Sequence, residues 1–267
     1  MVFLFGWFLM KRLDQFLAEN QKRIEEETVQ QQKPCLRLNG DISPDEMDDC
    51  LLYTSPEGQS ETFEVENNPV HPEQGTHTVT FSRNLWIEAD DFLPEPVPKY
   101  KRLYPEGPEC RLKSAYLIHC TGCKRDENGN VVEVYAEYDP ESRGGDPADG
   151  RKVKGATIHW VDAETCVDAE VRLYDNLFLD AQPDGADKDF LECMNPESLT
   201  VLTGCKVESA LVAEAKKYDE EGDGRAAHTA PCYQFMRVGY FCMDSKDCKA
   251  DHLVFNRSVL LKDSFKK

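Results

Sequence analysis

The chain has 267 residues, enough for one large or two small domains with a substantial core. Its net charge of −19 excludes a uniformly basic nucleic-acid-binding surface, although a local basic cluster could still bind phosphate. The 11 cysteines are odd in number and scattered, and no convincing secretory signal accompanies them, so we expect a reduced, cytoplasmic protein.

The first segment is apolar and is followed by a predicted helix. Residues 1–10 are too few to span a bilayer, which takes about 20 residues. Basic residues follow this apolar run, whereas a signal peptide carries them in front. We therefore expect no membrane association. Residues 11–32 repeat apolar residues at helical spacing and predict a short helix outside the main fold.

From Pro56 onward the sequence predicts an all-β fold. Short segments with β-branched and aromatic residues alternate with turn signals, and no long helices separate them. The Asn-Gly pair within Asp126–Asn130 predicts a hairpin turn, and Leu211–Lys217 predicts a short connecting helix. The predicted strands are Thr76–Phe81, Leu85–Glu88, Arg111–Cys120, Val131–Tyr138, Ala156–Val161, Ala169–Tyr174, Leu199–Val207, Tyr233–Cys242 and Val254–Leu261.

A long acidic loop, Asp139–Gly150, precedes a cluster of basic residues. Arg151, Lys152 and Lys154 follow the loop directly and lead into a predicted strand. A cationic rim beside a strand suits a phosphate backbone, but composition alone favours a solvated turn. A second basic cluster contains Lys101, Arg102 and Arg111. It indicates either guanine and phosphate recognition or a solvated strand end.

The remaining motifs allow structural interpretations. Gln234 and Arg237 flank an apolar pair, as in an ordinary alternating strand with Gln234 exposed. The Cys120–Cys123 pair lacks a second pair at tight spacing, so we expect buried apolar cysteines and no bound metal. His159 is expected to be a packed strand residue rather than a catalytic base.

Eight segments, taken together and in order, resemble the C-terminal anticodon-binding region of glutaminyl-tRNA synthetase, a class I aminoacyl-tRNA synthetase. One of them contains the wording DPADGRKVKG followed by IHWV. The resemblance covers about residues 56–265. The eight segments are Pro56–Pro69, Phe81–Phe92, Tyr100–Tyr116, Tyr138–Val161, Glu170–Phe178, Asn195–Leu199, Tyr233–Asp244 and Val254–Phe265.

The resemblance implies two six-stranded β-barrels in tandem, related to the barrel of a 5S-rRNA-binding ribosomal protein. The proximal barrel would comprise residues 56–167 plus 252–267, and the distal barrel residues 168–251. Residues 1–55 lie outside the resemblance, and Cys50–Ser55 matches a translated transposon-end adapter of sequencing libraries. We therefore expect a chimeric join there and a missing first barrel strand; a natural linker is the alternative.

The resemblance also implies a set of RNA-binding residues. Arg102 would recognise the third anticodon base, a guanine, while Lys101 contacts the neighbouring backbone. Arg111 and Leu112 would form the pocket for the first base. The middle base, a uracil, would be bound by three further positions or supported by them: Gln234, Arg237 and Ser264, the last standing where the family often has threonine. Arg151, Lys152 and Lys154 are possible contacts to the RNA backbone.

The implied partner is the anticodon loop of a glutamine tRNA. The nucleotide-binding fold of class I synthetases, with its HIGH-like and KMSKS-like motifs, is not found in this sequence, and neither is a Gly-rich phosphate loop. We therefore expect a non-catalytic part that binds no cofactor itself and accompanies the catalytic domain of a parent enzyme using ATP and magnesium. The alternatives are the tail of an archaeal or eukaryotic-type glutamyl-tRNA synthetase, or a stand-alone RNA- or protein-binding module on the ribosomal-protein-like barrel.

Overall fold

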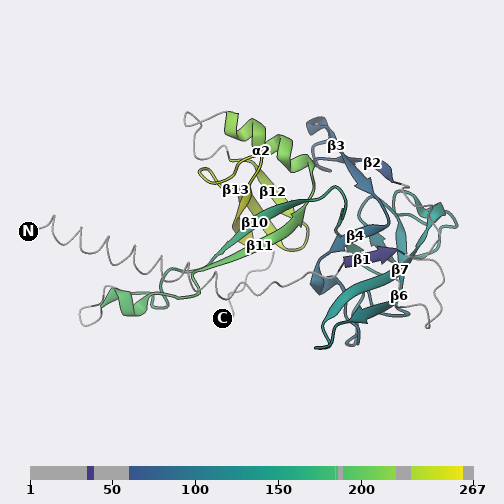
Figure 1. Cartoon of the computed structure of the whole chain (residues 1–267), viewed down its shortest axis with the longest axis horizontal. Coiled ribbons are helices and arrows are strands. Elements are labelled where there is room, and N and C mark those ends of the chain that lie inside the picture. Colours follow the sequence, from purple (N-terminus) through teal and green to yellow (C-terminus); the bar gives the residue numbers. More distant parts are fainter. Residues whose placement is uncertain (1–34, 39–59, 184, 186–188, 221–229, 261–267) are drawn as a thin grey trace, which may run out of the picture. The chain divides into compact units, whose positions relative to one another are not determined.

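The computed structural model describes residues 35–38, 60–183, 185, 189–220 and 230–260, and divides the chain into two compact units (Figure 1). Of the described residues, unit 2 contains 35–38, 60–167 and 206–213, and unit 1 contains those within 168–205 and 214–260. The predicted helix at residues 11–32 and the predicted join at Cys50–Ser55 lie outside the described residues.

Unit 2 is built on a seven-stranded sheet with the strand order β8-β5-β6-β7-β1-β4-β9. Its strands alternate between buried and exposed side chains, as a sheet with one covered face requires. In β5, for example, Cys110 and Leu112 are buried while Arg111 is half-exposed. The strands are β1 (Cys35–Leu38), β4 (Asn84–Ile87), β5 (Cys110–Leu112), β6 (Leu117–Arg125), β7 (Val131–Asp139), β8 (Thr157–Ile158) and β9 (Trp160–Asp162).

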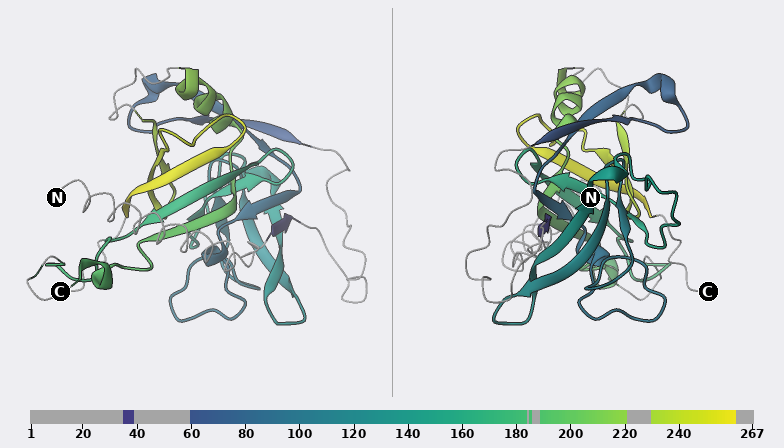
Figure 2. Two further views of the ribbon diagram at one scale, coloured as in Figure 1. Left: turned by 60° about the vertical axis from the view of Figure 1, so that its left-hand side comes forward. Right: turned by 90° about the vertical axis from the view of Figure 1, so that its right-hand side faces the viewer.

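The hairpin formed by β6 and β7 has the turn that the sequence predicts. The Asp126 N–H donates to the Asn130 carbonyl at 2.8 Å, and Gly129 adopts a positive φ of 84° that favours glycine. Figure 2 shows the two strands, in teal, running side by side to this turn. The predicted hairpin at Asp126–Asn130 is therefore confirmed.

A two-stranded ribbon packs aromatic side chains into the core of unit 2. The ribbon pairs β2 (Glu61–Glu66) with β3 (Thr76–Phe81). Phe81 lies with its ring centroid 5.2 Å from that of Tyr116 and 5.4 Å from that of Trp160. All three are buried, and Phe63 joins them. Such aromatic burial is the main stabilisation available to a small β unit. Short 3-10 turns are η2 (Pro72–Gln74), η3 (Ala89–Asp91), η4 (Pro140–Ser142) and η5 (Phe190–Cys193).

The position of β1 corrects one expectation. The sequence predicts that the first barrel strand is missing and that strand edges are left unpaired. Instead β1 pairs in parallel with β7 and antiparallel with β4, and it fills the sheet between them. Backbone pairing uses only N–H and C=O groups, so a segment without sequence resemblance can still complete a sheet.

Unit 1 carries a five-stranded sheet with the order β11-β10-β14-β13-β12. Its core contains Phe241 and Phe255, and Phe235 stacks on Phe241 at 4.2 Å. The predicted connecting helix appears as α2 (Ala210–Glu220), which buries Ala215 and Tyr218. The strands are β10 (Val167–Tyr174), β11 (Leu199–Val207), β12 (Cys232–Phe235), β13 (Gly239–Met243) and β14 (Leu253–Leu260).

The all-β prediction is confirmed, because α2 is the one α-helix that the described part of the chain contains. Neither sheet closes on itself in these residues, so the predicted six-stranded barrels appear as open sheets. The terminal strands of the larger sheet, β8 and β9, have only 2 and 3 residues and offer few backbone groups for closure. No helix in the described ranges is both long and apolar enough to cross a membrane.

Candidate nucleic-acid interface

A group of cationic side chains gathers around β5 in unit 2. Backbone hydrogen bonds hold its three chain segments together. The Ala156 N–H donates to the Lys101 carbonyl at 2.7 Å, and the Arg111 N–H donates to the Ala156 carbonyl at 3.0 Å. We call this group the β5 edge surface; its side chains are exposed or half-exposed, and they are Lys101, Arg111, Lys113, Lys152 and Lys154.

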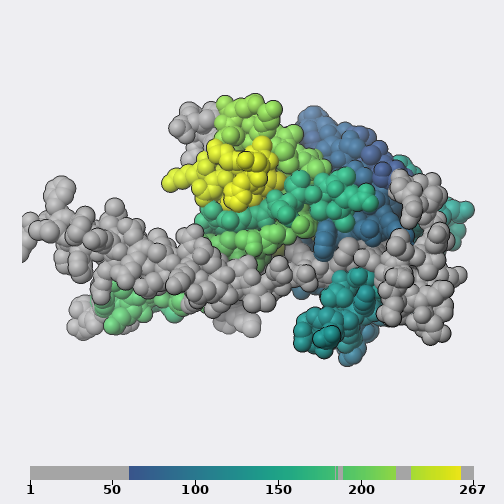
Figure 3. All heavy atoms as spheres, in the orientation of Figure 1, coloured from purple at the N-terminus to yellow at the C-terminus, as the bar shows by residue number. Residues whose placement is uncertain are grey.

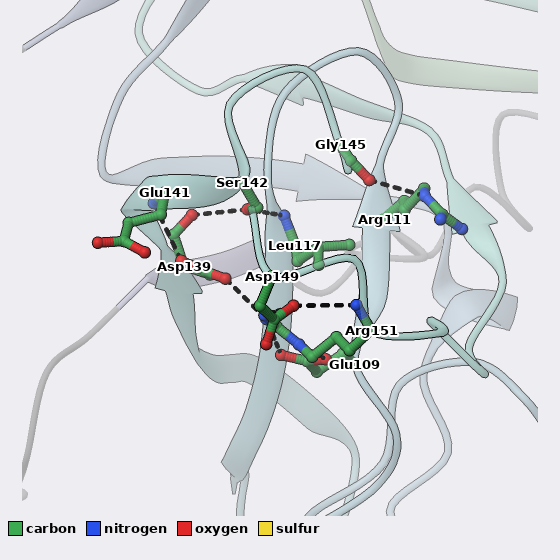
Figure 4. Close-up of polar contacts among 9 residues, drawn as sticks. All are labelled: Glu109, Arg111, Leu117, Asp139, Glu141, Ser142, Gly145, Asp149 and Arg151. Atoms are coloured by element: carbon green, nitrogen blue, oxygen red, sulfur yellow. Dashed lines mark hydrogen bonds and ion pairs between the residues drawn. The ribbon is translucent and has the colours of Figure 1, made fainter. Parts of the chain in front are cut away.

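The fold orients Arg111 within the β5 edge surface. Its Nε donates to the Gly145 carbonyl at 2.7 Å, and its Nη2 lies 3.2 Å from an Asp146 carboxylate oxygen (Figure 4). Gly145 has a positive φ of 92°, so glycine suits the turn that brings this carbonyl to the guanidinium. Arg111 remains about one-third exposed, with 32% of its side chain accessible. It is therefore fixed in direction and still open to a ligand.

Arg151 folds the acidic loop that the sequence singles out. Its guanidinium donates to Glu109 at 2.8 and 2.9 Å, to Asp139 at 2.7 Å and to Asp149 at 3.0 Å (Figure 4). The hydrogen bonds to Glu109, then those to Asp139 and Asp149, raise the pKa of Arg151. Most of its donors are thus committed to carboxylates, so it shapes the loop and has few donors left for phosphate. Lys152 and Lys154 are exposed and form no ion pair with the described acids.

A serine fixes the start of the same loop. The Ser142 hydroxyl donates to the Asp139 carbonyl at 2.6 Å and accepts from the Leu117 N–H at 2.8 Å (Figure 4). Ser142 is fully buried, so both partners satisfy a hydroxyl that would otherwise be costly to bury. The loop is therefore an ordered structure next to β5 rather than a loosely solvated turn.

Arg102 is held by an acidic turn on one side. Its Nη1 donates to the Asp90 carbonyl at 2.8 Å and lies 3.5 Å from the buried carboxylate of Asp91. Both contacts use the same guanidinium nitrogen, and 35% of the side chain remains exposed. A planar guanidinium with further N–H groups toward solvent can donate two parallel hydrogen bonds to a guanine edge. The adjacent Lys101 is exposed.

Leu112 differs from its predicted role. The side chain has no exposed surface and belongs to the core of unit 2. Its N–H donates to the Tyr116 carbonyl at 2.8 Å, and its carbonyl accepts from the Ala115 N–H at 3.0 Å. The alternation of β5 explains this, because neighbouring residues of a strand face opposite sides. Arg111 can therefore contact a ligand in this structure, and the Leu112 side chain cannot.

The second candidate surface is the hairpin β12–β13 of unit 1. Gln234 is exposed on β12, while Tyr233 and Phe235 turn inward against Phe255, with ring centroids 6.0 and 5.4 Å away. Arg237 lies in the turn with a positive φ of 64°, a strained backbone often found at functional sites. Figure 3 shows the yellow residues 230–260 at the surface of unit 1. Ser264, the remaining predicted site residue, lies outside the described residues.

Two exposed residues join these surfaces although their roles are not predicted from the sequence. Lys113 lies two residues after Arg111, on the same side of its strand. Tyr240 is 44% exposed and lies opposite Gln234 in the hairpin register. The signal for Tyr240 is present in the sequence, because a three-residue turn after Phe235 pairs position 234 with position 240.

The cysteines and acids offer no metal centre. Within the described ranges, no group of three or more His, Cys, Asp or Glu side chains is placed to hold a metal ion. Cys120 is buried, and burial raises the pKa of its thiol to about 12, which keeps it protonated. A buried neutral thiol packs as a small apolar side chain.

Comparison with known families gives the class of the protein. The profile "tRNA synthetases class I (E and Q), anti-codon binding domain" matches residues 48–139, and a second profile with the same description matches residues 157–244. The chain belongs to this anticodon-binding family. The first match includes residues 48–55, which precede the predicted start of the resemblance at Pro56.

The similar curated proteins are more particular. The chain is 46% identical over 216 residues to the glutamine–tRNA ligase of Clostridioides difficile, covering 81% of this chain and 36% of that protein. It is 47% identical over 217 residues to the ligase of the same name from Vibrio vulnificus, covering 81% and 36%. With the Bordetella parapertussis enzyme the identity is 47% over 216 residues, covering 80% and 34%. The chain thus spans about a third of the length of these relatives.

Proposed function

We propose that the chain binds the anticodon loop of a glutamine tRNA, as the C-terminal part of a glutamine–tRNA ligase. The observation that carries this proposal is that each matched domain presents the polar side chains that its family resemblance assigns to RNA. Arg102 and Arg111 are accessible in unit 2, and Gln234 is accessible in unit 1. The choice of glutamine rests on the relatives, since the family description covers both E and Q enzymes.

In unit 2, Arg102 would recognise the third anticodon base. Its Nη1 is held by the turn at Asp90 and Asp91, which orients the guanidinium before RNA arrives. The remaining N–H groups would donate to the O6 and N7 atoms of a guanine. Arg111, fixed by Gly145 and Asp146, would contact the first base without help from the buried Leu112 side chain.

In unit 1, Gln234 would pair with the edge of the middle base, a uracil, and Arg237 would lie beside it in the turn. A side-chain amide both donates and accepts hydrogen bonds, which suits the mixed edge of a uracil. The exposed lysines Lys101, Lys152 and Lys154 would contact phosphates, which supply affinity without sequence preference. The strongly negative chain would thereby bind RNA through local positive fields.

The parent reaction would be the ATP-dependent joining of glutamine to its tRNA, with magnesium, in the cytoplasm. This chain's residues would contribute recognition of the anticodon to that reaction, next to the catalytic domain of the same ligase. The assignment follows from the relatives, of which the chain spans about a third.

Fluorescence anisotropy with a labelled anticodon stem-loop tests the proposal. The full chain should bind the glutamine anticodon more tightly than the same stem-loop with the third base changed, by about 1–3 kcal/mol. Arg102→Ala should abolish this preference. Arg125→Ala is the matched control, because it removes an equally charged side chain at the far end of β6, where Arg125 pairs with Glu95 at 3.7 Å. Equal binding of wild type to both RNAs would contradict the proposal.

A further inference from the structure

Two cysteines face each other across the hairpin that carries Gln234. In the β12–β13 register Cys232 lies opposite Cys242, and Gln234 lies opposite Tyr240. Both thiols are free; Cys232 is exposed and Cys242 is half-buried. The two residues are the same number of positions from the hairpin turn as their partners, so the pairing is fixed by the turn rather than by chance approach.

The hydrogen-bond pattern places the two thiols at the closer kind of cross-strand position. The Met243 N–H donates to the Pro231 carbonyl at 3.1 Å, which makes Pro231 and Met243 a hydrogen-bonded pair. Hydrogen-bonded and non-hydrogen-bonded pairs alternate along antiparallel strands, so Cys232 and Cys242 form a non-hydrogen-bonded pair. The Cα atoms of such pairs lie about 4.5 Å apart, within the range that a disulfide spans.

The present contacts of the two thiols are weak. The Cys232 Sγ lies 3.4 Å from the Ala230 carbonyl oxygen, and the Cys242 Sγ lies 3.7 Å from the Asn256 carbonyl oxygen. Thiols are poor hydrogen-bond donors, so rotating both side chains toward each other costs little. Both residues also belong to the described part of the sheet, in which β13 is paired on its two sides and limits movement of the strands.

We propose that Cys232 and Cys242 form a reversible disulfide under mild oxidation, and that this disulfide lowers the affinity of the hairpin for RNA. With hydrogen peroxide as oxidant, the Cys232 thiolate attacks one oxygen, becoming a sulfenic acid and releasing water after proton uptake. The Cys242 thiolate then attacks the Cys232 sulfur and displaces a second water. Two thiols are oxidised to one disulfide, and the peroxide is reduced to two waters.

Two features make this disulfide labile rather than structural. A bridge across adjacent antiparallel strands departs from relaxed disulfide geometry, and strained or exposed disulfides are the more easily reduced ones. Burial, and then the neighbouring Cys242, raise the pKa of Cys232, so less of it is thiolate near neutral pH. Oxidation should therefore be faster in mildly alkaline buffer.

The link to RNA binding rests on the proposed function. Cys232 and Gln234 are both exposed and lie two residues apart on β12, so their side chains share one face of the hairpin. Drawing Cys232 toward Cys242 twists the strand next to Gln234 and its neighbour Tyr240. Gln234 would then no longer be aligned with the base that it is proposed to bind.

Peptide mapping by mass spectrometry tests the thiol pair. The full chain is treated with hydrogen peroxide, the remaining thiols are alkylated, and the digest is compared before and after reduction. We expect a peptide joined through Cys232 and Cys242 that reduction removes. It should be missing from Cys232→Ser and Cys242→Ser and retained in Cys193→Ser, which alters another half-buried cysteine of unit 1. The absence of a joined peptide in wild type, or indiscriminate joining of Cys232 to other cysteines, would overturn the proposal.

Anisotropy with the glutamine anticodon stem-loop then tests the coupling. The oxidised chain should bind about 5-fold more weakly or worse, with recovery on reduction and no change in Cys242→Ser. A disulfide that forms and leaves RNA affinity unchanged would overturn the coupling. If the reduced chain binds no anticodon RNA at all, the proposed function fails, while the thiol pair stands or falls on the peptide map.

Discussion

The two candidate surfaces hold their polar side chains in different ways. In unit 2 the arginines are tied to acidic groups: Arg102 to Asp91, and Arg111 to Asp146. In unit 1, Gln234 is neutral and exposed, and its direction is set by the strand register above a stacked aromatic core. Charge pairing therefore orients the first surface, and backbone pairing orients the second. The difference predicts that substitutions, salt and pH affect the two surfaces unequally.

The largest expected effect separates a core residue from a surface residue of the same predicted site. Leu112→Ala should lower the free energy of unfolding by about 2–5 kcal/mol, because the side chain is fully buried. Urea unfolding followed by tryptophan fluorescence reports this, since Trp86 and Trp160 both lie in unit 2. Gln234→Ala, at an exposed position, should change stability by about 0.5 kcal/mol or less. A Leu112→Ala chain as stable as wild type would contradict the burial of this residue.

The next effect is on the salt dependence of RNA binding. Arg102→Ala and Gln234→Ala should each weaken binding of the glutamine anticodon stem-loop by about 1–3 kcal/mol. Arg102→Ala removes a charge, so any phosphate attraction it supplies is lost and the salt dependence should become shallower. Gln234→Ala removes no charge and should leave the salt slope unchanged. Anisotropy titrations at several salt concentrations measure both quantities, and a changed slope in Gln234→Ala would blur the contrast between the surfaces.

A smaller effect concerns pH and an ion-pair clamp in unit 2. Glu208 lies between two histidines, 2.8 Å from His77 and 3.1 Å from His159. The hydrogen bond from Glu208 raises the pKa of His77, and Glu64 adds to the shift, while Asn67 accepts at the other ring nitrogen. Burial opposes ionisation of Glu208, yet the two histidines outweigh it and lower its pKa to about 2.

These shifts fix the sign of the pH dependence. The His77 contribution is complete below the ordinary value of 6.5 and is lost as pH rises through the raised pKa. The Glu208 contribution is present above 4.5 and is lost as pH falls toward about 2. His77→Gln should therefore destabilise unit 2 more at about pH 5.5 than at about pH 8, by about 1 kcal/mol or less. Urea unfolding at the two values measures this, with the more exposed His71→Gln as control; an equal loss at both values would contradict the clamp.

The smallest effect is expected at a buried hydroxyl of unit 1. The Tyr233 hydroxyl is buried and has no hydrogen-bond partner in the described part of the chain. An unsatisfied buried hydroxyl costs free energy, so Tyr233→Phe should be neutral or stabilise unit 1 by up to about 1 kcal/mol. Thermal unfolding compares it with Phe235→Leu, which disturbs the aromatic stack and should lower stability. A clear loss in Tyr233→Phe would mean that the hydroxyl has a partner after all.

Local features of the fold were predictable, and long-range ones were not. The turn at Asp126–Asn130 follows from an Asn-Gly pair, and α2 follows from helical spacing, because both depend on neighbouring residues. Arg151 instead gains its partner Glu109 from 42 residues away, and no local pattern encodes that contact. The insertion of β1 between β7 and β4 was equally hidden, since it depends on backbone pairing between distant segments.

The site was predictable in its residue types but not in their surroundings. The family resemblance identifies Arg102, Arg111 and Gln234, and all three retain exposed surface. It also identifies Leu112, whose burial follows from the alternation of β5. The sequence also suggests Arg151 as a phosphate contact, and three carboxylates occupy its guanidinium. Which cation remains available depends on tertiary ion pairs that the residue type alone does not reveal.

The central claim is that unit 2 and unit 1 recognise different anticodon bases. Anisotropy with stem-loops changed singly at the middle or the third base tests it most directly, using Arg102→Ala and Gln234→Ala. Arg102→Ala should lose discrimination at the third base and keep it at the middle base, and Gln234→Ala should show the reverse. If both variants lose discrimination at the same base, or if neither loses any, the assignment of the two surfaces is contradicted.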